Sequence, residues 1–435
     1  MTAVLERPVA HDSAETFVPS HGRARRELAA ASVGGVVEGY DWMIYAVMAP
    51  YFAIQMFPGD DPVAKLLAAY VGFAVGFIAR PLGSILIGRW ADKHGRRSAL
   101  VLSMVTIAAA NLVIALTPTS AAIGFAAALV LVLSRIVMGI SFGGELPSAS
   151  AYITETAPAK RRFLYSGIAS LGGVIGPILA FITLAILLGT MGASGVENGG
   201  WRIAFVVAAV AGLVALWIRS GVDESHVFKQ TEAQPRPPAW PLLRSNLRLI
   251  TAVFVGCAGG TIAFYLGTVY LPVYADAHGV IERAAAEKMM PAALLVMMVA
   301  MVVSGWLADR FGGFAIFRLG YILLAIGTGP LLLLLAAGKI SFLLTAVIYL
   351  ACFSLALAQA NVIFSQLFPT AIRVIGYGIP YTISAAIFGG TTPLVAQSFA
   401  AAGHTSWLMW YAAGAAIVSM LATLLVRPAD IKVKS

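Results

Sequence analysis

The sequence has few charged residues for its length. Of its 435 residues, 11% are charged and 60% are hydrophobic. Residues 98–134, for example, contain no charged side chain. A soluble protein carries more charge than this on its surface, whereas a helix that spans a membrane needs about 20 mostly apolar residues in a row. The composition therefore excludes a soluble protein and predicts a chain with many spanning helices.

Several other signals are missing. The two cysteines, Cys257 and Cys352, lie in apolar runs without partner spacing, so neither a disulfide framework nor a metal site is expected. The chain lacks a phosphate-binding Gly-x-x-x-x-Gly-Lys-Ser/Thr motif, which argues against ATP as an energy source. The short segments of alternating polarity that build outer-membrane barrels are absent as well. We expect no cofactor, no metal and no enzymatic activity.

Apolar runs alternate with short polar breaks along the whole chain. We expect twelve transmembrane helices, at 27–57, 63–88, 97–116, 121–156, 163–189, 201–220, 246–276, 284–308, 314–335, 340–368, 372–400 and 406–426. Between the sixth and the seventh helix lies a polar stretch with four prolines, which is typical of a semi-rigid linker. The prediction is an all-α polytopic membrane protein with two six-helix halves.

The predicted boundaries divide the chain into five parts. They are a cytoplasmic tail at 1–26, an N-terminal half at 27–220, a cytoplasmic linker at 221–245, a C-terminal half at 246–427 and a short cytoplasmic tail at 428–435. The orientation follows from the basic residues, because 22 of the 29 lie in the two tails and in alternate loops. Both termini are therefore expected in the cytoplasm. The net charge of +9 is explained by this orientation, and no nucleic-acid binding is expected.

An internal repeat supports the division into halves. Residues 88–97 read GRWADKHGRR, and residues 305–312, which lie 217 positions further on, read GWLADRFG. A weaker pair, 211 positions apart, places a proline and an arginine after the fourth and the tenth helix. Parallel repeats of this kind are typical of transporters, whose substrate site lies between the halves near the middle of the bilayer.

These segments, together with RIVMG at 135–139, resemble signatures of the major facilitator superfamily. More narrowly, the chain resembles the metabolite:proton symporter family, which includes carriers of citrate, α-ketoglutarate, shikimate, and proline or betaine. The segments that carry this resemblance are GVVEGYDW at 35–42, RPLG at 80–83, GGE at 143–145, LFPTAIR at 367–373 and FGG at 388–390. The sequence departs from the family, which usually has Asn, Phe and Gln, at Gly35, Trp42 and Met138.

The resemblance implies that the two repeated loops form a conformational latch between the halves. Its expected members are Gly88, Asp92, Gly95, Arg96, Arg97, Asp309 and Arg310. The glycines allow tight turns and close helix contact, and an aspartate can cap a helix end. A plain cytoplasmic turn, whose charges only set the topology, is the alternative.

Charges inside the predicted helices point to a site. Five clear cases occur well inside the helices, all in the N-terminal half: Glu38, Asp41, Arg80, Arg135 and Glu145. Each costs about 2.5 to 3.5 kcal/mol at the bilayer centre. At 1.5 Å per residue, Asp41 and Arg135 both lie about 21 Å from the ends of their helices, so they are expected to meet. We expect proton coupling by Asp41, with Glu38 and Glu145 as further candidates. The expected substrate-binding residues are Arg80, Arg135, Tyr45, Tyr265, Tyr270, Gln359, Asn361 and Tyr381. Static ion pairs that only hold helices together are the alternative.

The resulting expectation is a proton-coupled symporter in the plasma membrane, the inner membrane of a bacterium. It imports a small organic acid by alternating access and works as a monomer, and its partners are the solute, protons and the lipid bilayer. Uptake of a zwitterionic osmolyte and proton-driven efflux are the alternatives within transport. A membrane-bound sensor or enzyme is the alternative from another class, although the chain has neither a soluble regulatory domain nor a nucleophile constellation.

Overall fold

The computed structural model describes residues 21–94, 96–142, 159–220, 244–369, 373–427 and 430. Every regular element in these ranges is a helix, as predicted. The helices of the N-terminal half are α1 (His21–Met56), α2 (Pro62–His94), α3 (Arg96–Leu116), α4 (Ser120–Ile123), α5 (Ala126–Phe142), α7 (Arg162–Ser170), α8 (Gly172–Gly195) and α9 (Trp201–Ser220). Those of the C-terminal half are α12 (Leu247–Tyr265), α13 (Leu271–Ala277), α14 (Arg283–Phe311), α15 (Gly313–Ala336), α16 (Phe342–Ser365), α17 (Arg373–Ser384), α18 (Thr392–Ala401) and α19 (Trp407–Ala422).

The described helices account for all twelve predicted spans. Four of these spans are interrupted. Gly124, with φ of 60°, ends α4 and separates it from α5, and the rest of that span lies outside the described residues. The fifth span consists of α7 and α8. The seventh and the eleventh contain π-helical turns at Leu266–Tyr270 and Ala385–Gly389, a feature that is frequent at functional sites.

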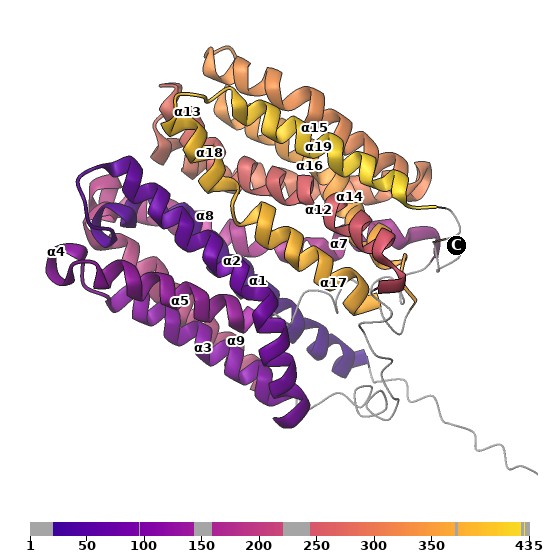
Figure 1. Ribbon diagram of the computed structural model, residues 1–435, viewed down its shortest axis with the longest axis horizontal. Coiled ribbons are helices and arrows are strands. Elements are labelled where there is room, and N and C mark those ends of the chain that lie inside the picture. The colour runs from indigo at the N-terminus through magenta and orange to yellow at the C-terminus, as the bar shows by residue number, and fades with distance from the viewer. Residues whose placement is uncertain are drawn as a thin grey trace, which may run out of the picture.

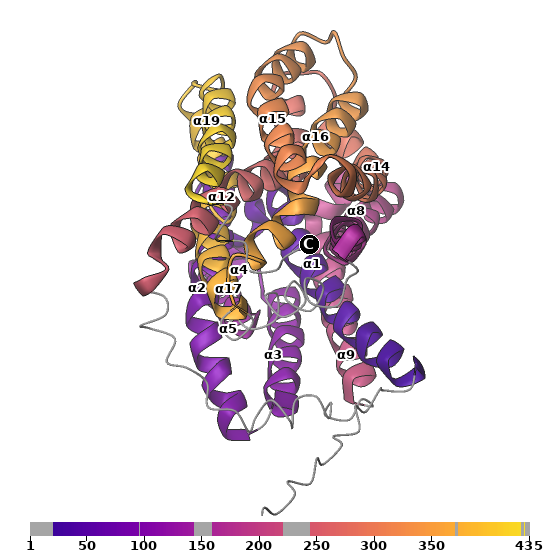
Figure 2. The ribbon, with the colours of Figure 1, turned by 90° about the vertical axis from the view of Figure 1, so that its right-hand side faces the viewer.

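The helices form two groups that face each other. In Figure 1 the indigo-to-magenta helices of the N-terminal half lie below the orange-to-yellow helices of the C-terminal half. The two groups meet along several lines of contact: α17 and α18 lie against α2, and α7 and α8 lie against α14. Figure 2 shows the same division from the side, with α3 and α9 far from α15 and α16. Side chains at this interface can therefore contact helices of both halves.

The outer surface of the helices is apolar. Seven stretches are long and apolar enough to cross a membrane, and one of them, Arg162–Ile218, contains two of the predicted spans. Large side chains such as Trp217 and Trp410 are 77% and 78% exposed, which is expected where lipid rather than water covers the protein. The chain is an integral membrane protein.

Backbone contact between α2 and α5 brings two buried arginines together. A Cβ atom on Gly139 would lie 2.0 Å from the carbonyl oxygen of Gly76, and one on Gly83 would lie 2.0 Å from that of Ile140. Small residues at such crossings let membrane helices approach closely. Arg80 in α2 and Arg135 in α5 therefore project from two helices that touch.

Candidate functional site

The centre of the N-terminal half contains a fully buried ion pair. Arg135 Nη1 lies 3.4 Å from Asp41 Oδ2, and the two side chains are 0% and 1% exposed. Asn111 in α3 donates from Nδ2 to the other oxygen, Asp41 Oδ1, at 2.7 Å. The pairing of Asp41 with Arg135, expected from depth counting alone, is confirmed. The contribution of Asn111 was not anticipated, although it is the one amide side chain in α3.

A second ion pair lies one helical turn away along α1. Arg80 Nη2 lies 3.4 Å from Glu38 Oε1, and both side chains are less than one-tenth exposed. Glu38 and Arg80 were expected to share a layer, and they do. Glu145, the third carboxylate expected there, lies outside the described residues.

The ring of Trp42 connects the two pairs. The guanidinium carbon of Arg80 lies 4.0 Å from the ring centroid of Trp42, and that of Arg135 lies 4.3 Å from it. Arg135 also lies 4.4 Å from the ring of Tyr45, whose hydroxyl donates to the carbonyl oxygen of Ala69. Cation–π contacts reach about 2 kcal/mol when both partners are desolvated. A shift of one arginine can therefore move the ring of Trp42 and so alter the position of the other arginine.

Several buried N–H groups of this cluster have no hydrogen-bond partner among the described residues. They are Nε and Nη2 of Arg135, Nε of Arg80 and Nε1 of Trp42. Leaving a buried donor unsatisfied costs about 1 to 3 kcal/mol, so native proteins rarely do so without a reason. An anionic group with several acceptor oxygens, such as a carboxylate, can satisfy such donors together. The cluster is thus suited to bind an anion.

The C-terminal half faces this cluster with aromatic side chains. The ring of Tyr265 lies 5.5 Å from that of Phe73 and 5.6 Å from that of Phe77, so α12 touches α2 at mid-depth. Tyr265 and Tyr381 are both close enough to Arg80 to interact with it electrostatically. The structure therefore brings two of the expected C-terminal tyrosines to the charged residues of the N-terminal half.

Other residues predicted for the substrate site make different contacts. Gln359 is fully buried within the C-terminal half, where Nε2 donates to Ser304 Oγ at 2.7 Å. Tyr270 is buried in the π-helical turn, within electrostatic range of Tyr274. Asn361 accepts from the hydroxyl of Tyr377 at 2.7 Å and donates to Ser170 Oγ across the interface between the halves at 3.2 Å.

One of the two repeated loops makes a contact between the halves. The carboxylate of Asp309, at the end of α14, accepts hydrogen bonds from the backbone N–H groups of Phe163 at 2.9 Å and Leu164 at 3.0 Å. It thereby caps the first turn of α7. A Cβ on Gly305 would lie 2.6 Å from the carbonyl oxygen of Phe163, so the two backbones touch there. The guanidinium of Arg310 is exposed and lies within 6 Å of the rings of its neighbours on α14.

The first repeated loop is described only in part. Gly88 and Asp92 lie in α2, and Arg96 and Arg97 lie at the start of α3, but their side chains and Gly95 are outside the described part of the chain. The latch role of this loop stays a prediction.

The end of the molecule opposite Asp309 has a contact between the halves that was not predicted from the sequence. The hydroxyl of Tyr51 in α1 donates to Glu287 Oε2 in α14 at 2.5 Å. Arg283 and Glu287 are four residues apart, a spacing typical of a paired helix face, but Arg283 falls in a predicted loop. That i, i+4 spacing is the signal that could have revealed the cluster.

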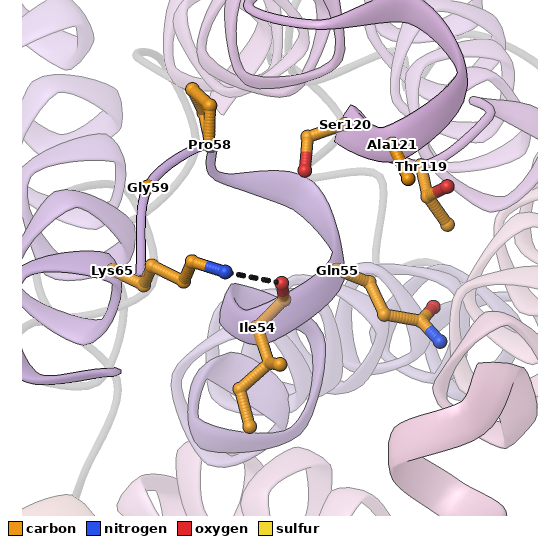
Figure 3. Close-up of a pocket in the computed structure, with 8 residues that line it drawn as sticks. All are labelled: Ile54, Gln55, Pro58, Gly59, Lys65, Thr119, Ser120 and Ala121. Atoms are coloured by element: carbon orange, nitrogen blue, oxygen red, sulfur yellow. Dashed lines mark hydrogen bonds between the residues drawn. The ribbon is translucent and has the colours of Figure 1, made fainter. Parts of the chain in front are cut away.

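A surface pocket lies apart from these charges. It lies between the ends of α1 and α2 and the start of α4, where Lys65 Nζ donates to the carbonyl oxygen of Ile54 at 3.1 Å (Figure 3). None of the predicted site residues lines it. Within the described ranges, no group of three or more His, Cys, Asp and Glu side chains is arranged to hold a metal ion. The candidate site is therefore the pair of buried ion pairs around Trp42.

The chain is similar to known transport proteins. The model of the Major Facilitator Superfamily matches residues 31–390. The chain is 31% identical to the α-ketoglutarate permease of Escherichia coli strain K12, over 95% of this chain and 96% of that one. It is 31% identical to the ectoine/proline transporter ProP of Corynebacterium glutamicum, over 84% and 76%, and 28% identical to the citrate-proton symporter of Salmonella typhi, over 90% and 92%. Among solved structures, the xylose transporter XylE from E. coli, in a partially occluded inward-open conformation, superposes with a TM-score of 0.74 at 17% identity, over 94% and 98% of the two chains.

Proposed function

Since the chain belongs to the major facilitator superfamily and is a membrane transporter, we propose that it is a proton-coupled symporter that imports a small organic acid. The observation that carries this proposal is the buried cluster of two arginines, two carboxylates and Trp42 inside the N-terminal half, which Tyr265 of the other half faces. The arginines recognise an anion, and the carboxylates carry protons. A buried charge at this depth is costly, which favours a functional role over a purely structural one.

The proposed mechanism rests on competition between Asp41 and the carboxylate of the solute for Arg135. With the site empty, Asp41 neutralises Arg135. When the carboxylate of a solute reaches the free N–H groups of Arg135, it shares the positive charge, and Asp41 then binds a proton. The negative charge of the solute has then replaced that of Asp41, so the loaded site stays neutral and crosses to the other face as the two halves rock. Glu38 and Arg80 repeat this arrangement one turn away.

The energy available from one proton is sufficient for strong accumulation. One proton that moves down about 100 mV and about one pH unit releases roughly 3.7 kcal/mol. This corresponds to accumulation of about 500-fold for a neutral solute. For a monoanion, the voltage contributions of the proton and the solute cancel, and the pH gradient alone drives uptake.

The names of the relatives support a solute with a carboxylate. They include transporters of α-ketoglutarate, shikimate and citrate, and also transporters of proline and betaine. Proline and betaine carry a carboxylate as well, so uptake of a zwitterionic osmolyte is the second candidate function. It requires a site for the cationic group beside the arginines, for which the aromatic ring of Tyr265 is suited.

We propose the orientation on the basis of charge. Both termini and the linker at 221–245 lie in the cytoplasm, because basic residues are concentrated in these segments and in the loops on the same side. The N-terminal half then comprises residues 27–220 and the C-terminal half residues 246–427. In this orientation Asp309 lies at the cytoplasmic end and Glu287 at the outer end. A single chain contains both halves, which supports a functional monomer.

Transport into proteoliposomes tests the proposal. Radiolabelled α-ketoglutarate, citrate, shikimate and proline are offered to vesicles with an alkaline interior, with and without a protonophore. The expected result is protonophore-sensitive accumulation of one or more of the three acids, above that of proline. Stronger accumulation of proline would favour the osmolyte function. Loss of preloaded solute against its gradient, driven by the same inward proton gradient, would favour efflux.

A further inference from the structure

A second cluster of charged and tyrosine side chains lies away from the central ion pairs, at the end of α14 opposite Asp309. Glu287 is only 3% exposed. One of its oxygens, Oε2, accepts the hydroxyl hydrogen bond of Tyr51 at 2.5 Å. The other, Oε1, lies 3.8 Å from Nε of Arg283, one turn earlier on the same helix. The mechanism proposed above makes no use of this buried carboxylate.

The cluster connects the two halves. Tyr51 belongs to α1 and Glu287 to α14, so their hydrogen bond crosses the interface. The guanidinium of Arg283 lies 4.7 Å from the ring centroid of Tyr51, and its Nη2 lies 4.0 Å from Glu197 Oε1 in the N-terminal half. The halves cannot separate at this end unless these contacts break.

The titratable groups around Glu287 come from several elements. Tyr51 is on α1, Tyr70 on α2 and Tyr270 on the π-helical turn of the C-terminal half, and Asp276 lies at the end of α13. Arg283 is the cation of this group, and it is shared between Glu287 and Glu197. The hydroxyl of Tyr70 is buried and has no hydrogen-bond partner among the described residues.

We propose that Glu287 is a second proton-binding site, which takes a proton from the outer side and thereby favours closure of the interface between the halves at that end. This inference rests on the proposed proton-coupled function and on the proposed orientation. The proton adds to one carboxylate oxygen of Glu287 and leaves the side chain neutral. No other bond is made or broken except the hydrogen bonds that follow.

The physical reason is the burial of Glu287. In the closed state its side chain is only 3% exposed, and burial favours the neutral carboxylic acid over the charged carboxylate. Tyr51 and Arg283 stabilise the charged form in return, but when this end opens, water reaches the carboxylate and its charge costs less. By linkage, the state that is closed at this end binds the proton more tightly than the open state. Proton binding from the outside and closure of the outer end thus favour each other.

The distance between the outer ends of the halves tests this inference without any substrate. Spin labels are attached to cysteines introduced at the exposed positions Ala121 and Lys339, after Cys257 and Cys352 have been replaced by alanine. Pulsed electron–electron double resonance then measures the distance between the two labels at neutral and at acidic pH. For the otherwise unchanged protein, the population with the shorter distance is expected to grow at acidic pH.

Three variants show whether Glu287 and its bond to Tyr51 cause the pH response. Glu287→Gln resembles the protonated form and should decrease the ratio of open to closed population about tenfold at neutral pH, because the amide carries no charge that is costly to bury. It should also abolish the pH response. Tyr51→Phe removes the hydrogen bond across the interface and should instead open the same end about tenfold, the size expected for loss of a hydrogen bond to a charged group. Tyr70→Phe deletes a hydroxyl from the same layer that makes no hydrogen bond to the described residues, and should behave like the parent protein.

Two results would overturn the inference. One is a pH response that persists in Glu287→Gln, and the other is an effect of Tyr70→Phe as large as that of Tyr51→Phe. Uptake assays keep the proposed function separate. If solute accumulation does not depend on a proton gradient while the labels still respond to pH through Glu287, the symporter proposal fails and the second proton site stands. If accumulation depends on the gradient but the labels do not respond, only this inference fails.

Discussion

The two halves of the molecule carry their buried charge at different depths. In the N-terminal half, two ion pairs lie around Trp42 at mid-depth. At the same depth the C-terminal half presents tyrosines, and its half-buried or buried carboxylates, Asp309 and Glu287, lie near the two ends of α14. Each of these two carboxylates accepts hydrogen bonds from the opposite half.

This difference suggests a division of roles. Charge at mid-depth is suited to bind a solute and a proton, because both must be neutralised there before they cross the bilayer. Charge at the ends of the interface is suited to control which end opens. Both ends are joined in this structure, by the Asp309 cap and by the bond between Tyr51 and Glu287. In alternating access, one of these contacts has to break while the other holds.

The largest effect is expected from Asp41→Asn. The amide keeps the shape of the side chain and can still accept a hydrogen bond from Asn111, but it cannot take up a proton. Accumulation driven by a pH gradient should fall to background, whereas counterflow exchange, which needs no net proton movement, should persist. The matched control is Asp60→Asn at an exposed position. If Asp41→Asn accumulates solute at the parent rate, Asp41 is not the group that couples transport to protons.

The next effect concerns Arg80→Lys. Lysine retains the positive charge but loses the planar fork that binds a carboxylate with two hydrogen bonds. Affinity for an organic acid, measured by equilibrium binding, should fall about 10- to 100-fold, the range expected for one or two hydrogen bonds to a charged group. Arg310→Lys, at an exposed position, serves as the control. Unchanged affinity in Arg80→Lys would mean that Arg80 only pairs with Glu38.

The central ion pair could be predicted from the sequence because depth in a membrane helix depends on residue number alone. Each residue rises 1.5 Å, so counting residues from the helix ends is enough to place Asp41 and Arg135 at one level. The apolar runs likewise indicated all twelve spans. The fold as a whole was therefore accessible from composition, the basic residues and the repeat.

The contacts between the halves could not be predicted in this way. The bond between Tyr51 and Glu287 depends on how α1 and α14 are rotated relative to each other, and residue number does not determine that rotation. The π-helical turn at Leu266–Tyr270 has the same origin, because one extra residue in a turn is decided by packing around it. Asn111 was missed for a simpler reason. A polar side chain in a helix often donates only to a backbone carbonyl of the preceding turn, and Asn111 does donate to the carbonyl oxygen of Ile107 as well.

A smaller effect is expected from Asp309→Asn at the other end of the interface. The amide retains one acceptor oxygen, so only one of the two N–H groups at the start of α7 stays capped. Loss of a helix cap costs about 1 kcal/mol, which shifts the conformational equilibrium about fivefold toward opening at that end. Turnover should change while equilibrium affinity for the solute stays nearly constant. If affinity falls as much as turnover, Asp309 supports the fold in general and does not control one end of the interface.

The smallest effect is expected from Trp42→Phe, which tests the ring that connects the two ion pairs of the N-terminal half. Phenylalanine keeps an aromatic ring between Arg80 and Arg135, so much of the cation–π attraction survives, although it is weaker than with tryptophan. What is lost is the buried Nε1–H, which has no partner among the described residues. If that donor meets an uncharged oxygen of the solute, affinity should fall about threefold, near the low end of the range for one hydrogen bond between uncharged partners.

The ratio of protons to solute should stay unchanged in Trp42→Phe, because both carboxylates remain. Reversal-potential measurements in proteoliposomes give this ratio, and Trp410→Phe, on the exposed surface of α19, controls for loss of an indole. Unchanged affinity would show that the indole N–H does not face the solute. A changed ratio would have a different meaning. It would show that the ring does more than hold two arginines in place, because the protonation of Asp41 and that of Glu38 would then be linked through it.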